Sequence, residues 1–460
     1  MISKIKYWLT HRLFIVPTLI VASATLILFN VTSIGFVDKC DGYNYLTNGF
    51  ALKKMGRDFM NPNFNTYEDF QKNPSEFNFN LVPYPNKLFS LIAINSSLDE
   101  NTVYPGRTTM WSTLAGVLGI LFLWTLISDI SNAQLATITC GFVLFNSQLI
   151  FYLGRPLSDP FAFLFITVSL YFFTRSKNIF HYTLGTVFLG LAMAFRLQAF
   201  FVLAPIIMLE ISRQKTKLQS AKETLISLLL VIIGSFLTFK IIVWIIEISL
   251  YANAIKTSNN FGHYINWAKN SLVTVDWKTI TNYCLSNFKT VFFNPAFCLP
   301  VLGSLYIPQK FRKNINYQFL RWFSYFGLFF PFLFYSISPG FETRYLIYSM
   351  PFLVFFTVVN IFNIIPEKNK ERISWLATIF IILYWSYISF YTPDILTSFQ
   401  LKQYFSLRIP LEHRTTPASE GIILTNKSLA GAVFKNFNLI RIPPYEDLLL
   451  ISALDKLHIS

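Results

Sequence analysis

Charged residues are scarce in this chain of 460 residues, since Asp, Glu, Lys and Arg together make up only 13% of it. Soluble domains carry about 25% charged residues. In place of a charged surface the sequence has 50 Phe residues and a hydrophobic share of 53%. This composition excludes an ordinary soluble enzyme and predicts an integral membrane protein, in contact with membrane lipids.

Cysteine is also rare, and the four cysteines lack the spacing of a zinc site. Cys140 and Cys298 lie inside apolar runs and are interpreted as core residues. Cys40 and Cys284 both fall on the predicted outer side, where they could form a pair.

Acidic residues are outnumbered, 23 against 38 basic ones, which gives a formal charge of +15. The basic residues stand in short clusters between apolar runs, as cytoplasmic loops of membrane proteins do. No contiguous basic face can form across helices embedded in lipid, so we expect no nucleic-acid partner.

Apolar stretches with few or no charges, which approach the length of a membrane span, about 20 residues, recur along the sequence. They are 13–35, 108–128, 133–152, 159–174, 180–195, 197–211, 223–246, 288–306, 318–337, 345–363 and 373–391. The apolar run after the basic N-terminus is longer than that of a signal peptide, so we interpret it as an uncleaved first helix.

Basic clusters between the stretches predict the orientation of the chain. Four of them are 175–178, 213–222, 308–314 and 366–372. They share one side of the membrane only if the chain crosses twice around Arg196, in 180–195 and again in 197–211. We therefore predict an all-α polytopic protein of the inner (plasma) membrane with about eleven transmembrane helices, a cytoplasmic N-terminus and an extracytoplasmic C-terminus.

Two long loops, 36–106 and 247–287, then face the outside. Loops of more than about 12–15 residues are usually functional or disordered. Within the first loop, 86–98 has the apolar spacing of a helix and is expected to lie at the membrane interface.

The tail 392–460 also faces the outside and differs in composition from the rest. Its segment 421–444 has the pattern of a strand, a helix and a second strand. We therefore expect a transmembrane catalytic domain over 1–391 and a small α/β extracytoplasmic domain over 392–460.

Charged side chains at membrane depth or at its edge are costly, so those present are candidates for function. The predicted topology gathers several of them on the outer face from distant parts of the chain. They are Asp41, Arg155, Asp159, Arg196, Glu342 and Arg344.

Structural alternatives stay open for these residues. Asp41 could simply end the first helix, and Asp159 could cap its own helix and pair with Arg155 at four-residue spacing. Arg196 interrupts a long uncharged stretch, so it must snorkel, pair or bind an anion. Because Arg196 and Arg344 have no obvious local partner, we expect them to bind an anionic group.

Arginines and a carboxylate at a lipid–water boundary suit one kind of chemistry. The planar guanidinium fork binds phosphate oxygens in bidentate fashion. A carboxylate accepts a proton from an attacking hydroxyl or holds a metal ion beside a phosphate leaving group. The combination favours transfer of a sugar from a lipid phosphate.

The segment "CDGYNYLTNGFALKKMGRDF", from Cys40 to Phe59, resembles the first outer loop of GT-C-fold glycosyltransferases. That superfamily includes the protein O-mannosyltransferases and the lipid A aminoarabinose transferase. Shorter segments resemble further parts of the family in the same order: "YPNKLFSLI", "GRTTMWSTLAGVLGILFLW", "GRPLSDP", "AMAFRLQAF" and "ETRYLIYSMPFL". Each is short and degenerate, so only the ensemble is specific.

The resemblance implies a GT-C-like fold and a glycosyltransferase, hexosyl or pentosyl, that uses a polyprenyl-phosphate sugar donor. The acceptor would be a glycan, lipid or protein on the outer face of the membrane. Catalytic roles fall to Asp41 and Asp159. Substrate-binding roles fall to Tyr45, Tyr84, Arg155, Arg196, Glu342, Arg344 and Tyr345.

Gly42 stands where many family members have a second acid. A pair of adjacent carboxylates is therefore missing from the first loop. The resemblance leaves open whether a divalent metal serves as cofactor, and it assigns no metal ligand.

Two other classes of protein remain as alternatives. A flippase or transporter for lipid-linked sugars would place charges at mid-bilayer and break its helices there, often in repeated halves. The sequence shows no internal repeat, and its charges stand at the ends of apolar runs. An oligosaccharide polymerase or ligase of another fold would share the donor and the outer arginines, and the architecture of loop 36–106 would distinguish it.

Overall fold

The computed structural model describes a defined part of the chain. The described residues are Tyr45, 87–99, 102–103, 105–146, 149, 152–153, 157–175, 179–216, 218–250, 277–336, 343–370, 372–373, 375–377, 379–380, 383, 409–410, 422–425 and 438–441.

The chain divides into two compact units. The first comprises Met1–Gly35, Met110–Ile242 and Tyr264–Gln400. The second comprises Phe36–Thr109, Val243–His263 and Leu401–Ser460. The boundaries predicted at 391 and 392 stay a prediction.

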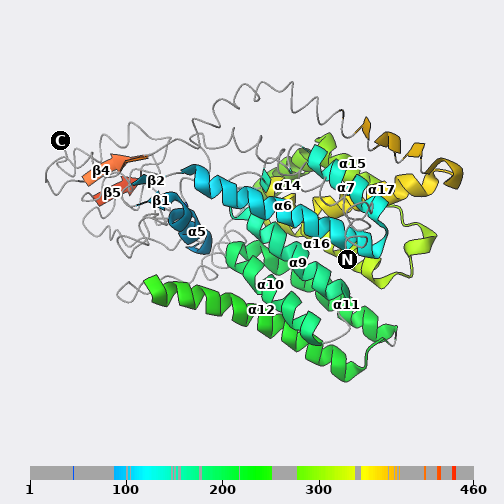
Figure 1. The fold of residues 1–460 in the computed structure, drawn as a ribbon, viewed down its shortest axis with the longest axis horizontal. Coiled ribbons are helices and arrows are strands. Elements are labelled where there is room, and N and C mark those ends of the chain that lie inside the picture. Colours follow the sequence, from blue (N-terminus) through cyan, green and yellow to red (C-terminus); the bar gives the residue numbers. More distant parts are fainter. Residues whose placement is uncertain are drawn as a thin grey trace, which may run out of the picture. The chain divides into compact units, whose positions relative to one another are not determined.

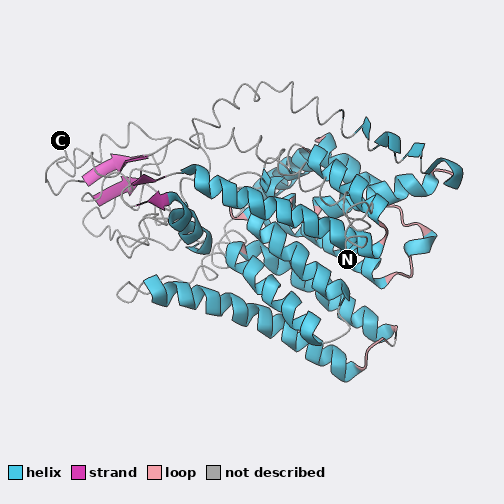
Figure 2. Ribbon diagram, viewed as in Figure 1, coloured by secondary structure: helices cyan, strands magenta, loops and turns pink. Residues whose placement is uncertain are grey.

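Helices dominate the described residues (Figure 2). In chain order the α-helices are α5 (Lys87–Ser97), α6 (Pro105–Ile130), α7 (Ala133–Phe145), α9 (Asp159–Arg175), α10 (Ile179–Phe195), α11 (Leu203–Lys215), α12 (Ala221–Leu250), α14 (Trp277–Phe292), α15 (Pro295–Gly303), α16 (Ile315–Phe334) and α17 (Met350–Ile364). Three 3₁₀ helices are η1 (Leu197–Val202), η2 (Gln309–Phe311) and η3 (Thr343–Leu346).

Several of these helices match the predicted spans. Within the described residues, three helical segments are long and apolar enough to cross a membrane: Arg107–Ile130, Leu197–Lys215 and Ala221–Ile246. Shorter apolar helices cover Ala133–Leu144, Ile179–Phe195 and Met350–Ile364. The total of eleven spans stays a prediction.

Helices extend into both ends of the predicted outer loop 247–287. Helix α12 continues to Leu250 and α14 begins at Trp277. The side of the membrane on which this segment lies stays a prediction. The apolar run 288–306 is divided between α14 and α15, with the break just before Pro295. Proline has no backbone N–H to donate inside a helix and is tolerated in the first turn, which explains the new start at this residue.

Helices α9 and α10 pack antiparallel and side by side (Figure 1). Ring pairs run along their interface, from Phe161 against Phe195 at 4.9 Å to Phe173 against Tyr182 at 6.0 Å. Gly185 gives Phe173 room, because a Cβ there would stand 3.0 Å from the ring. Aromatic contacts, some stacked and some edge-on, thus join the two helices from one end of their interface to the other.

Small residues let α12 approach α10 closely. A Cβ added at Gly190 would lie 2.6 Å from Thr238, and one added at Gly234 would lie 2.7 Å from Thr186. Helices in membranes associate through such small residues, which bring the backbones together.

The chain reverses direction at Arg196, as the charge pattern predicts. Arg196 has extended backbone angles, φ −148° and ψ 110°, and separates α10 from η1 and α11. At the far end of α11, Arg213 donates to the hydroxyl of Tyr182 near the start of α10 and to the carbonyl of Phe173. Helix α11 is therefore antiparallel to α10. The predicted division into two helices is confirmed, and their two crossings of the membrane stay a prediction.

The helix ends next to the basic clusters lie together at one end of these helices, as the following hydrogen bonds show. Asn316 at the start of α16 donates to the Thr174 carbonyl at 3.1 Å. Asn360 near the end of α17 donates to the carbonyls of Gly303 at 2.6 Å and Tyr306 at 2.9 Å. We call this end the basic-loop end, and the opposite end, where α9 begins and α10 finishes, the Arg196 end.

The second unit contains α5 and several short strands. Helix α5 confirms the helix predicted over 86–98. Strands β1 (Leu98–Asp99), β2 (Thr102–Val103) and β3 (Ile409–Pro410) form an antiparallel sheet. Strands β4 (Ile422–Thr425) and β5 (Asn438–Arg441) pair in parallel. These are the two strands predicted in 421–444, and the helix predicted between them lies outside the described residues.

Candidate functional site

A buried carboxylate stands at the start of α9. Asp159 is the first residue of the helix and has no exposed surface. The Nε of Arg196 donates to its Oδ1 at 3.1 Å, and the Nη2 donates to its Oδ2 at 2.6 Å. The hydroxyl of Tyr348 donates to Oδ1 at 3.0 Å. Both carboxylate oxygens are therefore engaged.

The local backbone explains how these groups meet. Ser158 directly precedes α9, and its carbonyl accepts the N–H of Ala162 at 3.1 Å. Asp159 therefore lies in the first turn of the helix. Arg196 follows the last residue of α10 in an extended conformation, so its side chain leaves the helix direction. A buried charge must be paired and hydrogen-bonded, and here the two charges meet each other.

Arg344 adds a second cation to this cluster. It lies in η3, is half-buried, and interacts electrostatically with Asp159. Its guanidinium also stands over the ring of Tyr345, 5.4 Å from the centroid. Among the described residues this cluster has one carboxylate and two guanidinium groups, and guanidinium groups can bind an anion such as a phosphate.

Two stacked tyrosine rings, those of Tyr335 and Tyr345, lie beside Arg344. Tyr335, which follows α16, stacks on Tyr345 with 4.6 Å between ring centroids and 5° between the planes. Its backbone carbonyl accepts from Asn287 at 3.0 Å. Its hydroxyl accepts from Nε2 of Gln198 at 3.2 Å, on the 3₁₀ helix that follows Arg196.

The structure brings four of the predicted site residues together at the Arg196 end: Asp159, Arg196, Arg344 and Tyr345. Their convergence from distant parts of the chain agrees with the predicted topology. Their roles toward a substrate remain predictions.

The other predicted residues are not part of this cluster. Asp41, Tyr84, Arg155 and Glu342 lie outside the described residues. Tyr45 belongs to the second unit, where it is fully buried and packs edge-on against Phe89 at 4.8 Å.

Of the three alternatives for Arg196, which were to snorkel, to pair or to bind an anion, the structure shows pairing. Its partner is Asp159, 37 residues earlier in the chain, and binding of an anion by Arg196 stays a prediction. Asp159 also does not use its side chain only for a local ion pair, because Arg196 and Tyr348 occupy its oxygens.

Sequence reasoning missed two residues of the site. Tyr348 is 189 residues from Asp159 in sequence, but the segment "ETRYLIYSMPFL" places it close after Arg344. Gln198 is the first polar residue after Arg196 in an apolar stretch. A polar side chain in such a stretch is a signal that could have found it.

A divalent metal does not fit the described part of this site. In that part of the chain no three side chains of His, Cys, Asp or Glu come together as a metal site would need. The oxygens of Asp159 are already engaged by a cation and a phenol. We therefore derive no step through a metal.

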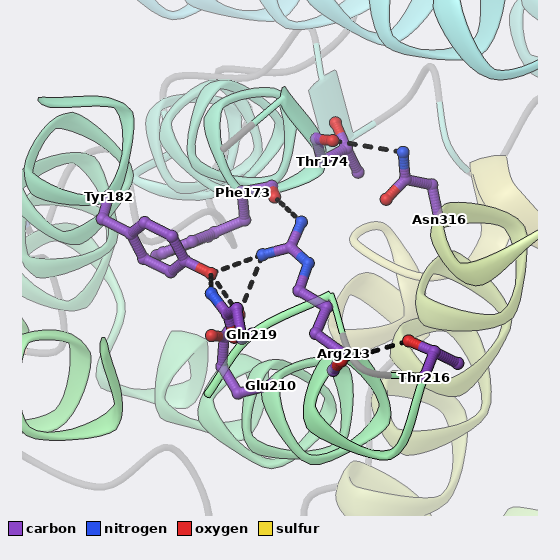
Figure 3. A network of polar contacts seen from close by, with 8 residues as sticks. All are labelled: Phe173, Thr174, Tyr182, Glu210, Arg213, Thr216, Gln219 and Asn316. Atoms are coloured by element: carbon purple, nitrogen blue, oxygen red, sulfur yellow. Dashed lines mark hydrogen bonds and ion pairs between the residues drawn. The ribbon is translucent and has the colours of Figure 1, made fainter. Parts of the chain in front are cut away.

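A second polar network lies at the basic-loop end (Figure 3). Glu210 accepts from the hydroxyl of Tyr182 at 2.6 Å and from Nη1 of Arg213 at 2.9 Å. Nη2 of Arg213 donates to the Phe173 carbonyl at 2.8 Å, and Gln219 donates to the Tyr182 hydroxyl at 3.2 Å. The network joins α9, α10 and α11, and its one carboxylate balances its one guanidinium.

The fold is similar to that of two solved crystal structures of ArnT. One is ArnT from Cupriavidus metallidurans bound to undecaprenyl phosphate, with a TM-score of 0.50 and 11% identity over 95% of this chain and 87% of that one. The other is the same enzyme in the apo state, with a TM-score of 0.50 and 11% identity over 96% and 88%.

Sequence comparisons add nothing to this likeness: no family model matches the chain, and no curated protein matches it. The fold and the apolar helices of span length together define a multi-pass membrane protein.

Proposed function

We propose that the chain is a membrane glycosyltransferase that moves a hexosyl or pentosyl group from a polyprenyl-phosphate donor to an acceptor on the outer face of the membrane. One observation carries the proposal above the others. The chain has a fold similar to that of ArnT over 95% of its length, and at the end opposite its basic loops a buried Asp159–Arg196 pair lies with the guanidinium of Arg344. That ArnT structure holds undecaprenyl phosphate.

The chemistry assigns a separate task to each group. Arg344, with Arg196 beside it, binds the phosphate of the donor. Asp159 and Tyr348 fix the guanidinium of Arg196, so that its orientation is set before the substrate arrives. The carboxylate of Asp41 takes the proton of the acceptor hydroxyl.

In the proposed transfer, the acceptor oxygen forms a bond to the anomeric carbon while the bond from that carbon to the phosphate oxygen breaks. The cations stabilise the negative charge that develops on the departing polyprenyl phosphate. The acceptor is a glycan, a lipid or a protein.

The direct test is transfer in vitro from a polyprenyl-phosphate sugar to acceptors in a membrane extract, followed by mass spectrometry of glycolipids and glycoproteins. Asp41→Asn is nearly isosteric and removes the charge, so transfer should fall about 10²–10⁴-fold. Asp129→Asn is the matched control, because that acid forms an exposed pair with Arg175 at the basic-loop end. A stable Asp41→Asn protein with normal turnover would refute the catalytic role.

The proposed location is the inner (plasma) membrane, with the N-terminus cytoplasmic and the C-terminus extracytoplasmic. Its support is the gathering of basic clusters at one end of the helices. A tag after Ser460 should be labelled from outside, whereas a tag in 213–222 should not. Labelling of both tags from the same side would overturn this topology.

A flippase for the same lipid would show a different result in the same assay. It would move the donor between leaflets of a vesicle without forming a glycosylated product. A fluorescent donor in proteoliposomes separates the two activities.

A further inference from the structure

Gln198 is a neutral polar side chain at the rim of the Arg196 end. It is half-buried in η1, just after Arg196. Among the described residues its side chain makes a single hydrogen bond, from Nε2 to the hydroxyl of Tyr335 at 3.2 Å. A glutamine amide has two N–H donors and a carbonyl acceptor, so one N–H and the carbonyl oxygen remain for another partner.

Its neighbours hold this amide in place. The ring of Tyr335 is stacked on Tyr345 at 4.6 Å, and its backbone carbonyl is bound by Asn287 at 3.0 Å. The hydroxyl that receives the Gln198 bond is therefore anchored on both sides. An amide bonded to an anchored phenol has lost much of its rotational freedom before any ligand binds, which favours specific recognition.

The Arg196 end presents two kinds of group, the charged arginines Arg196 and Arg344 and the neutral amide of Gln198. A phosphate oxygen accepts hydrogen bonds and is served by Arg344 and Arg196. A sugar hydroxyl both donates and accepts, and the N–H and the carbonyl of one amide can serve both functions. Tyr345 connects the two kinds of group, since its ring touches the guanidinium of Arg344 and stacks on Tyr335, the partner of Gln198.

We infer that Gln198 is a specificity-determining residue that binds a hydroxyl of the donor's sugar, adjacent to the phosphate held by the arginines. The inference rests on the proposed function. It assigns to the substrate a free hydroxyl within reach of the amide. An analogue that lacks this hydroxyl leaves the half-buried amide without this partner and binds more weakly.

The test separates recognition of the sugar from recognition of the phosphate. The Michaelis constant is measured for a polyprenyl-phosphate sugar, and the inhibition constant is measured for sugar-free undecaprenyl phosphate. Gln198→Met keeps the length of the side chain and removes the amide. The Michaelis constant should rise roughly three- to tenfold, while the inhibition constant stays within about twofold.

A purely structural role predicts another pattern. If Gln198 only supports Tyr335, then Tyr335→Phe, which keeps the stacked ring and removes the hydroxyl, should reproduce the loss seen in Gln198→Met. Our inference expects a smaller effect from Tyr335→Phe. Equal losses in the two variants, or an equal rise of both constants in Gln198→Met, would overturn it.

The inference and the proposed function can fail separately. If the wild-type protein binds the sugar donor and transfers nothing, the proposed function fails. In that case the inference is tested by measuring, in detergent, the binding of the sugar donor and of undecaprenyl phosphate to Gln198→Met. Selective loss of affinity for the sugar donor supports it, and unchanged selectivity overturns it.

Discussion

Two buried clusters with the same three kinds of side chain lie at opposite ends of one helix array. At the Arg196 end Asp159 is bound by Arg196 and Tyr348. At the basic-loop end Glu210 is bound by Arg213 and Tyr182 (Figure 3). Both carboxylates are fully buried. Because the chemistry is shared, what differs between the clusters shows what makes one of them a candidate site.

The difference lies in the charge balance and in the partners of the guanidinium. The network at the basic-loop end has one charge of each sign, and Arg213 also donates to the Phe173 carbonyl. Among the described residues, the cluster at the Arg196 end has a second guanidinium, that of the half-buried Arg344, which interacts with Asp159. We assign a structural role to the network of balanced charge, whereas a partly exposed second guanidinium beside an ion pair can bind an anionic substrate.

The largest effect is expected on breaking the balanced network. Arg213→Met keeps much of the side-chain volume but leaves Glu210 buried without its counter-charge. The free energy of unfolding should fall by about 3–5 kcal/mol, measured by denaturant unfolding in detergent. Arg175→Met is the matched control, because its pair with Asp129 is exposed and worth at most about 1 kcal/mol. Equal losses in the two variants would contradict the difference in burial.

The same comparison explains what sequence alone could predict. Apolar runs predicted the helices, and basic clusters predicted the reversal at Arg196, because both signals follow from the cost of charge in lipid. The convergence of Asp159, Arg196 and Arg344 followed from that topology. These predictions needed only the order of elements along the chain.

The choice of ion-pair partners could not be predicted in this way. Asp159 has Arg155 nearby in sequence, but the arginine that reaches its oxygens comes from the next helix. Sequence reasoning also missed the network at the basic-loop end, because Arg213 was grouped with the basic loop 213–222. Glu210 was the available signal, since it is an acid at i,i+3 spacing from Arg213.

A second prediction tests whether Glu210 and Arg213 act as one unit. Glu210→Gln removes the buried charge that Arg213→Met leaves uncompensated, so the double variant should be more stable than Arg213→Met alone. The coupling free energy should be about 1–3 kcal/mol. Purely additive losses in the double-mutant cycle would show that the two side chains contribute independently.

A third prediction concerns the second guanidinium, that of Arg344. Arg344→Lys keeps the charge and removes the planar fork, so the apparent affinity for the donor should fall about tenfold, or about 1.4 kcal/mol. Unfolding stability should change by less than about 0.5 kcal/mol, because the residue is half-buried. Arg213→Lys should show the reverse pattern, with lower stability and unchanged affinity in the folded fraction. An unchanged affinity in Arg344→Lys would remove this arginine from the site.

The smallest effect on donor binding is expected for the two phenols, and it separates support of structure from support of substrate binding. Tyr182 meets Glu210, Arg213 and Gln219, whereas Tyr348 donates to Asp159. Phe at either position removes one hydroxyl from a charged, buried partner, which costs about 1–3 kcal/mol.

Tyr182→Phe should lower the unfolding stability alone, because its partners Glu210 and Arg213 also bond to each other. Tyr348→Phe should lower stability less and also weaken donor binding two- to fivefold (about 0.4–1 kcal/mol), because Asp159 then orients Arg196 with one fewer restraint. Unfolding curves together with donor titrations of both variants check this. If Tyr182→Phe weakened donor binding as much as Tyr348→Phe, the two ends of the array would be coupled, and the assignment of structure to one and substrate to the other would fail.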